Sequence, residues 1–199
     1  FIIFPVIRTL TDDGIIDARD NEIIQEIFEK HTAGKIDYAS FVMGTLEAFN
    51  TALKGKKDSH IQGALDEHIA EIELYPWVHP TFEAIQSVGK LTVVSAEPGV
   101  ITRAVARLFN AEYVSSELDQ DANGHYTGAP YRALGSSQKG QAVSQDITAS
   151  RPRRVAGFGD SAGDVGMLEL ANPVEDAFCI TPDAELRAIA TRTGMTIID

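Results

Sequence analysis

The chain has 199 residues, 44% of them hydrophobic and 23% charged, a balance typical of a folded globular protein and unlike a disordered or fibrous one. Its net charge of −12 argues against nucleic acid and an anionic membrane as partners. The single cysteine, Cys179, excludes an intrachain disulfide, and no apolar run approaches the roughly 18 residues that a membrane span needs. We therefore expect a cytoplasmic protein.

Four short, continuous apolar runs predict buried parallel strands. They are "FIIF" at 1–4, "LTVVSA" at 91–96, "RVAGFGD" at 154–160 and "DAFCI" at 176–180. Helical patterns follow the last three runs or lie between them, at 99–109, 137–147, 162–171 and 183–191. Because strands and helices alternate, the sequence predicts an α/β fold with a doubly wound parallel sheet.

About 85 residues separate the first two predicted strands, which is too long for a single crossover. Helical spacing at 19–30, 37–54 and 58–73 predicts a helical subdomain there. We divide the chain into a core domain of residues 1–14 and 76–199 and a helical cap of residues 15–75. A hairpin is predicted at "ELDQDANGHYTG", with Asn123 and Gly124 as the two positive-φ residues of a tight turn.

The strongest chemical signal is "GFGDSAGDVGMLELA" at 157–171, where a predicted strand ends at Asp160 and Asp164 follows one turn later. Two carboxylates at this spacing lie together at the carboxyl edge of the sheet, where open α/β folds bind ligands. Such a pair suits a hard cation such as Mg²⁺. The alternative is purely structural, with Asp160 or Ser161 capping the helix and Asp164 adding charge to its first turn.

Two further positions point to an anionic ligand. Ser95 ends the second predicted strand, and the turn into the next helix offers free amide groups to an anion. Lys139 lies near a helix N-terminus, where a cation is unfavourable unless an anion is bound nearby. An N-cap serine and a solvated lysine are the ordinary alternatives.

In their order along the chain, these motifs resemble the haloacid dehalogenase (HAD) superfamily, in its phosphoserine-phosphatase-like branch. "VVSAEPGVITRAVA" resembles the second motif, "SSQKGQA" the lysine motif and "GDSAGDVGMLELA" the aspartate motif. The resemblance implies a Rossmann-like parallel sheet core with an inserted helical cap. It also implies phosphate binding by Ser95, Ala96 and Lys139, and Mg²⁺ binding by Asp160 and Asp164.

In that family the first strand ends in Asp-x-Asp-Gly-Thr, with a nucleophilic and an acid/base aspartate. Aligned on "FIIF" as the first strand, these two positions fall on Pro5 and Ile7. Neither side chain can attack phosphorus or donate a proton, so no catalytic residue is expected. With one carboxylate ligand gone, the Mg²⁺ site is expected to be weak or lost.

Arg8 falls beside the phosphate position in the same alignment. Two interpretations remain open. Arg8 pairs with Asp160 or Asp164 in place of the missing cation, or it joins Lys139 and Ser95 in holding an anion.

The leading functional hypothesis is therefore a pseudophosphatase that binds a small anionic or phosphorylated ligand. The first alternative is an active Mg²⁺-dependent phosphomonoester hydrolase, or an engineered inactive variant of one. The second is a structural or regulatory protein whose cap mediates oligomer formation. The apolar residues of 37–54 are interpreted as the core of the cap, namely Phe41, Met43, Leu46, Phe49 and Leu53.

Overall fold

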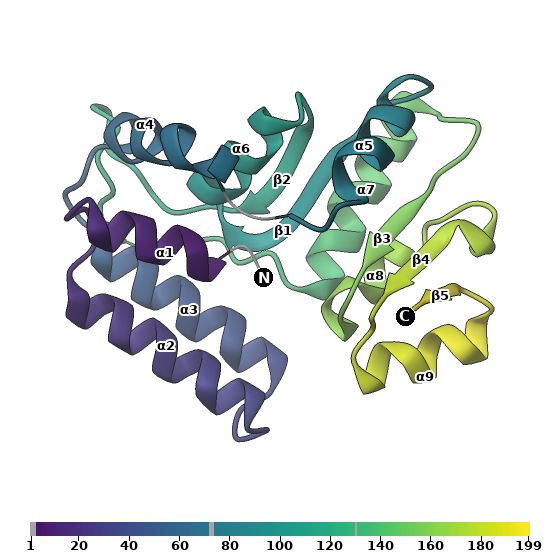
Figure 1. Cartoon of the computed structure of the whole chain (residues 1–199), viewed down its shortest axis with the longest axis horizontal. Coiled ribbons are helices and arrows are strands. Elements are labelled where there is room, and N and C mark those ends of the chain that lie inside the picture. Colours follow the sequence, from purple (N-terminus) through teal and green to yellow (C-terminus); the bar gives the residue numbers. More distant parts are fainter. Residues whose placement is uncertain (1–2, 72–73, 130) are drawn as a thin grey trace. The chain divides into compact units, whose positions relative to one another are not determined.

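The computed structural model describes residues 3–71, 74–129 and 131–199 (Figure 1). The α-helices in chain order are α1 (Ile3–Asp12), α2 (Ala18–Thr32), α3 (Tyr38–Ala52), α4 (Asp58–His68), α5 (Val78–Gln86), α6 (Gly99–Leu108), α7 (Ser136–Ser150), α8 (Val165–Leu168) and α9 (Ala184–Thr193). The strands are β1 (Thr92–Pro98), β2 (Glu112–Ser116), β3 (Gly157–Gly159), β4 (Ala177–Ile180) and β5 (Thr196–Ile198). Short 3₁₀ turns are η1 (Ile69–Glu71), η2 (Ala162–Asp164) and η3 (Val174–Asp176).

The contacts divide the chain into two compact units, one ending at Ala133 and the other beginning at Leu134. In the N-terminal unit β1 pairs with β2 in parallel, with Val94 opposite Val114. Helix α6 packs on both strands, and α2 lies alongside α3 (Figure 1). One apolar core joins α1, α3, α4 and α6, so most helices of this unit share a single core.

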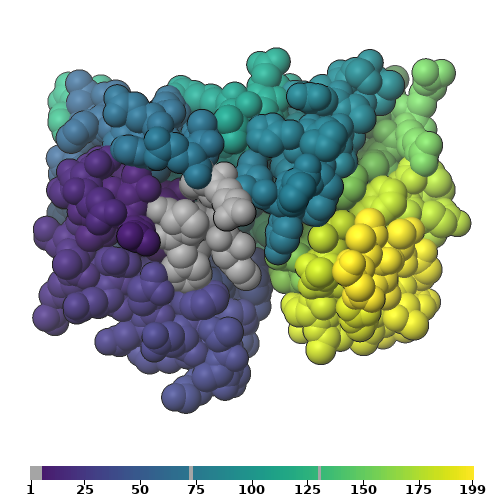
Figure 2. Space-filling view, viewed as in Figure 1, coloured from purple at the N-terminus to yellow at the C-terminus, as the bar shows by residue number. Residues whose placement is uncertain are grey.

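The C-terminal unit contains a three-stranded parallel sheet in the order β3-β4-β5. Leu168 of α8 and Leu186 of α9 pack with Ala177 and Cys179 of β4 to form its core. Helix α9 begins where the Asp183 carboxylate accepts a hydrogen bond from the Leu186 amide, and it ends at Gly194, which has a φ of 84°. The last residues of the chain, coloured yellow, are visible on the surface of this unit (Figure 2).

The predicted α/β class with parallel strands is confirmed. The predicted strands at 91–96, 154–160 and 176–180 are found as β1, β3 and β4. The predicted helices of the cap are found as α2, α3 and α4, and those that follow β1 and β4 as α6 and α9. The division into domains at residues 14 and 76 stays a prediction.

The predicted first strand is wrong. Residues 1–2 lie outside the described residues, and Ile3 begins helix α1 instead of continuing a strand. Val6, Ile7 and Leu10 are all buried, and their spacing of one and four residues is that of a helix face. Pro5 lies in the first turn, where its missing N–H has no helical partner to lose. An apolar run of four residues does not distinguish a strand from the start of such a helix.

The predicted hairpin is present, but its turn differs from the prediction. Antiparallel bridges join Gln120 to Tyr126 and Glu117 to Arg132. Gly124 has a positive φ of 78°, and the described non-glycine residues with positive φ do not include Asn123. The Asp121 carboxylate instead accepts hydrogen bonds from the amides of Asn123 and His125, at 2.8 and 2.9 Å. An aspartate turn followed by a single left-handed glycine therefore replaces the predicted two-residue turn.

Candidate functional site

The corner between β3 and η2 is organised by hydrogen bonds to the carboxylate of Asp164. The carboxylate of Asp164 turns back toward the strand end, where its Oδ2 accepts hydrogen bonds from the amides of Asp160 (3.1 Å) and Ser161 (3.3 Å). The Ser161 hydroxyl donates to the same oxygen at 3.3 Å. The predicted proximity of Asp160 and Asp164 is therefore present, in the form of a turn closed by the second carboxylate.

Helix α7 brings Lys139 to this corner. Lys139 Nζ donates to Asp164 Oδ1 at 2.8 Å, and the two side chains are only 5% and 9% exposed. A buried pair of this kind recovers the cost of desolvating two charges only when its geometry is good and further hydrogen bonds are made. Here Asp164 uses both oxygens, so its charge is fully satisfied.

The same carboxylate influences its titratable neighbours. Desolvation, and then the negative charge of Asp164, raise the pKa of Asp160, although that residue is exposed overall. Burial, again followed by the charge of Asp164, raises the pKa of the Cys179 thiol on β4. Asp160 therefore holds its proton more readily than an isolated aspartate does.

Close backbone contacts fix α7 and α8 beside this corner. A Cβ atom on Gly140 would lie 2.5 Å from the carbonyl oxygen of Gly166, and one on Gly166 would lie 2.5 Å from that of Ser136. A Cβ atom on Gly159 would lie 2.6 Å from the Cβ of Asp164. These three glycines allow Lys139 and Asp164 to meet.

The described residues do not fit a complete Mg²⁺ site. Among residues 3–71, 74–129 and 131–199, no cluster of three or more His, Cys, Asp or Glu side chains could hold a metal ion. Both oxygens of Asp164 are used by Lys139 and by the turn, which leaves the exposed carboxylate of Asp160 as the oxygen donor of this corner. Mg²⁺ requires near-octahedral oxygen coordination, which the carboxylate of Asp160 alone does not supply.

In the N-terminal unit, the segment that ends β1 is tightly fixed. The Ser95 hydroxyl oxygen accepts a hydrogen bond from the Glu97 amide at 3.2 Å, and the Ser116 hydroxyl donates to the Ala96 carbonyl at 2.7 Å. A Cβ atom on Gly99 would lie 3.1 Å from Ser115 Oγ, so α6 begins in close contact with β2. The prediction that the strand ends at Ser95 is wrong, because Ser95 and Ala96 lie within β1, which continues to Pro98 and leads directly into α6.

The alignment of Pro5 and Ile7 with the two catalytic positions of the family loses its structural basis. Both residues belong to α1, and the Ile7 side chain is fully buried in the core of the N-terminal unit. Arg8 lies on the same helix, where it is 84% exposed and its Nε lies 3.8 Å from Asp12 Oδ2. The expected environment of Arg8, a loop at the end of a first strand, is therefore wrong.

Two positioning residues escaped the sequence analysis. The Asp183 carboxylate accepts hydrogen bonds from the amides of Leu186 and Ala162, and its own amide donates to the Asp160 carbonyl. Asp183 thus ties the start of α9 to the Asp160 corner. Its signal was present, since Asp three residues before Leu186 has the pattern of an N-cap. Ser116, which holds Ala96, had no comparable signal.

Four of the five apolar residues that were expected to form the core of the cap are buried, but Phe49 and Leu53 belong to the core that α3 shares with α1, α4 and α6. Phe41, Leu46, Phe49 and Leu53 are buried, whereas Met43 is exposed. The side chains at the start of α3 pack with Ala96, at the end of β1.

Solved structures similar to this chain share its fold. A protein of unknown function from Bordetella pertussis Tohama I matches with a TM-score of 0.74 and 18% identity, over 96% of this chain and 88% of its own. A substrate-bound phosphoserine phosphatase matches with a TM-score of 0.63 and 17% identity, over 91% and 82%. A probable phosphoserine phosphatase from Vibrio cholerae matches with a TM-score of 0.62 and 15% identity, over 89% of this chain and 52% of its own.

No curated protein matches the sequence significantly. Among the described helices, none combines the length and the apolar character required to cross a membrane. The chain thus shares the Rossmann-like α/β fold of phosphoserine phosphatases. The sequence model of the haloacid dehalogenase-like hydrolases matches residues 10–169, and the chain belongs to this family.

Proposed function

We propose that this chain is a HAD-family protein that binds inorganic phosphate or a small phosphorylated molecule and does not hydrolyse it by the aspartyl-phosphate route of the family. The observation that carries the proposal is the buried pair of Lys139 and Asp164 at the carboxyl end of β3. The proposed setting is the cytoplasm, with a small anion and not a nucleic acid as the ligand.

The energetics of the buried pair support a role in binding. A buried ion pair is often no more stabilising than apolar side chains of similar volume, so stability alone does not explain it. The pair fixes a lysine ammonium group at the edge of the sheet where α/β folds bind their ligands. A fixed ammonium group is a common phosphate-binding element, because it presents a compact positive charge.

The placement of the aspartates supports the absence of turnover. A nucleophile must lie about 3–3.5 Å from phosphorus and in line with the leaving group. Asp12 and Asp13, the candidates nearest the predicted first motif, lie at the C-terminal end of helix α1. Neither Asp12 nor Asp13 therefore follows the end of a strand, which is where the resemblance places the nucleophile of the family.

The test combines binding and turnover on the purified 199-residue chain. Titration calorimetry with inorganic phosphate should give saturable binding that Lys139→Met weakens by about tenfold or more, because one charge-assisted hydrogen bond is lost. The control variant Arg187→Met removes an exposed cation of the same unit and should leave binding unchanged. Phosphate release from p-nitrophenyl phosphate or phosphoserine should stay at background, with or without Mg²⁺.

Two results would contradict the proposal. Absence of phosphate binding would disprove the claim that the chain binds phosphate. It would favour the alternative of a structural or oligomerising protein, and sedimentation tests that alternative directly. Mg²⁺-dependent phosphate release that Asp160→Asn abolishes would overturn its second half, and would identify an active phosphomonoesterase.

A further inference from the structure

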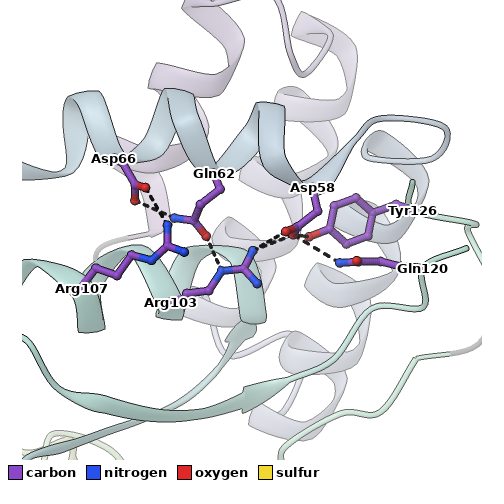
Figure 3. Close-up of polar contacts among 7 residues, drawn as sticks. All are labelled: Asp58, Gln62, Asp66, Arg103, Arg107, Gln120 and Tyr126. Carbon is purple, nitrogen blue, oxygen red and sulfur yellow. Dashed lines mark hydrogen bonds and ion pairs between the residues drawn. The ribbon is translucent and has the colours of Figure 1, made fainter. Parts of the chain in front are cut away.

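A network of seven polar side chains joins α4, α6 and the hairpin in the N-terminal unit (Figure 3). Its centre is Asp58, the first residue of α4. The Nη2 of Arg103 donates to both carboxylate oxygens of Asp58 at 2.7 Å, and the Tyr126 hydroxyl donates to its Oδ1 at 2.5 Å. Gln120 Nε2 adds a further bond at 3.2 Å. One carboxylate thus binds side chains from α6 and from both arms of the hairpin.

The network continues along the two helices as a ladder (Figure 3). Gln62 follows Asp58 by one turn and accepts a hydrogen bond from Arg103 Nε. Gln62 also donates to Asp66 at 2.7 Å, and Asp66 in turn accepts from Arg107 at 2.7 Å. The repeat of four residues on both helices places these groups on the faces that meet.

Backbone hydrogen bonds strengthen the same junction. The amide of Asp58 donates to the Gly124 carbonyl at 2.8 Å, and the amide of Tyr126 donates to the Lys56 carbonyl at 3.0 Å. Beneath the network, Ile61 and Leu65 of α4 share the buried core with Ile101 of α6. The start of α4, the hairpin and α6 are therefore held together by both polar and apolar contacts.

Helix α6 transmits this restraint to the end of β1. Arg103 lies four residues after Gly99, about 6 Å along the helix axis. Gly99 directly follows Pro98, the last residue of β1. Ser95 and Ala96 lie two to three residues before Pro98, and the Ser116 hydroxyl of β2 donates a hydrogen bond to the Ala96 carbonyl. A helix fixed at Arg103 therefore fixes the orientation of its own first turn and of the segment from Ser95 to Pro98.

We propose that Asp58, Arg103 and Tyr126 form a clasp that positions the Ser95–Pro98 segment by holding α6 to the start of α4 and to the hairpin. Arg103 is a positioning residue in this inference, because it acts through α6 and not on the ligand. The consequence for phosphate affinity rests on the proposed function; the effect on the segment itself does not.

The chain offers a matched pair of variants for the test. Arg103→Gln removes the cation at the centre of the clasp, and Arg107→Gln makes the same substitution one turn later in an exposed ion pair. Tyr126→Phe removes one hydroxyl and keeps the buried ring, which makes it the variant most certain to fold.

Amide hydrogen exchange of the full chain is the primary measurement. Arg103→Gln should accelerate exchange by about tenfold or more in peptides that cover 92–103 and 118–127, while β4 and α9 change by less than about twofold. Tyr126→Phe should produce a smaller change in the same two peptides. Arg107→Gln should change all peptides by less than about twofold.

Equal changes in Arg103→Gln and Arg107→Gln, or an acceleration spread evenly over both units, would overturn the clasp. Phosphate titration separates this inference from the proposed function. Arg103→Gln should weaken phosphate binding by about fivefold or more and Arg107→Gln should not. If the unaltered chain binds no phosphate, the proposed function fails, whereas the exchange result still decides the clasp.

Discussion

The two units of the molecule use charged side chains in different ways. In the C-terminal unit Lys139 and Asp164 form an ion pair in which both side chains are almost fully buried, and close glycine contacts bring their elements together. In the N-terminal unit the Asp58 network lies at the rim of a large apolar core, and the side chains of Asp58 and Arg103 remain about one-fifth exposed. In a buried charge pair the loss of one side chain leaves the other charge without its partner. In the network at the rim, Asp58 and Arg103 each have more than one partner, so the loss of one contact costs less stability.

This difference suggests a division of roles. The Lys139–Asp164 pair is placed where a ligand is expected, and its removal leaves an uncompensated charge. The Asp58 network aligns elements that already share a core, and its removal loosens them. The predictions below test whether each unit depends on the feature assigned to it, beginning with the largest expected effect.

The core of α1 should not accept a charge. Ile7→Asp introduces the acid that the family carries in its first motif, but into a fully buried position of helix α1. Because the new carboxylate would lie among apolar side chains, the free energy of unfolding should fall by about 4 kcal/mol or more. Urea denaturation measures the loss. A variant that keeps its stability and gains phosphatase activity would restore the original alignment.

The neighbouring residue provides the control. Arg8→Ala removes an exposed side chain whose ion pair with Asp12 spans 3.8 Å. Surface pairs of this kind contribute about 0–1 kcal/mol, so stability should hardly change, and phosphate affinity should not change at all.

The buried pair should be the most sensitive charge contact of the C-terminal unit. Lys139→Met keeps most of the side-chain volume and leaves Asp164 buried without its cation. The expected loss is about 3–5 kcal/mol in the free energy of unfolding. The exposed pair of Arg187 and Asp199 supplies the comparison, since Arg187→Met should cost less than about 1 kcal/mol. Similar losses in both variants would show that the buried Lys139–Asp164 pair contributes no more to stability than an exposed pair.

Two glycine substitutions should have effects of opposite sign. Gly140→Ala places a methyl group against the Gly166 carbonyl and should destabilise the chain by about 1–3 kcal/mol. Gly63→Ala lies on α4 with no atom within 4 Å of the new methyl group, so it should stabilise by about 0.5–1 kcal/mol. Thermal unfolding of both variants measures the signs, and a stabilising Gly140→Ala would disprove the close contact of α7 and α8.

The smallest effect concerns the pH dependence of the rim network. Burial, followed by the hydrogen bond to Asp58, raises the pKa of Tyr126 above its ordinary value near 10. Folding therefore favours the neutral phenol, and this stabilisation is fully present below pH 10 and is lost as the pH rises through the folded pKa. In an ultraviolet titration, the absorbance step that Tyr126→Phe removes should lie above pH 10. A step at or below pH 10 would contradict the buried hydrogen bond.

Most of the fold was predictable from local patterns. The strand and helix of "LTVVSA" and "GVITRAVARLF" carry clear apolar periodicity, and β1 and α6 match them. The first run failed because "FIIF" is too short to show a period, and only tertiary packing reveals that Val6, Ile7 and Leu10 share a helix face. The alignment of Pro5 and Ile7 with the two catalytic positions of the family depended on that strand and is wrong for the same reason.

The site was predictable in its residues but not in their contacts. The sequence placed Asp160, Asp164 and Lys139 at the ends of their elements, and the structure brings Lys139 to Asp164. It could not show that Asp164 uses both oxygens internally, since that depends on the turn at Ser161. The clasp was equally hidden, because Asp58 and Arg103 are 45 residues apart in the chain.

The most direct test of the account is phosphate release by the pure chain in the presence of Mg²⁺, compared with the Asp160→Asn variant. We predict that both proteins release phosphate from p-nitrophenyl phosphate only at the background rate. Release by the unaltered chain that disappears in Asp160→Asn would contradict the account.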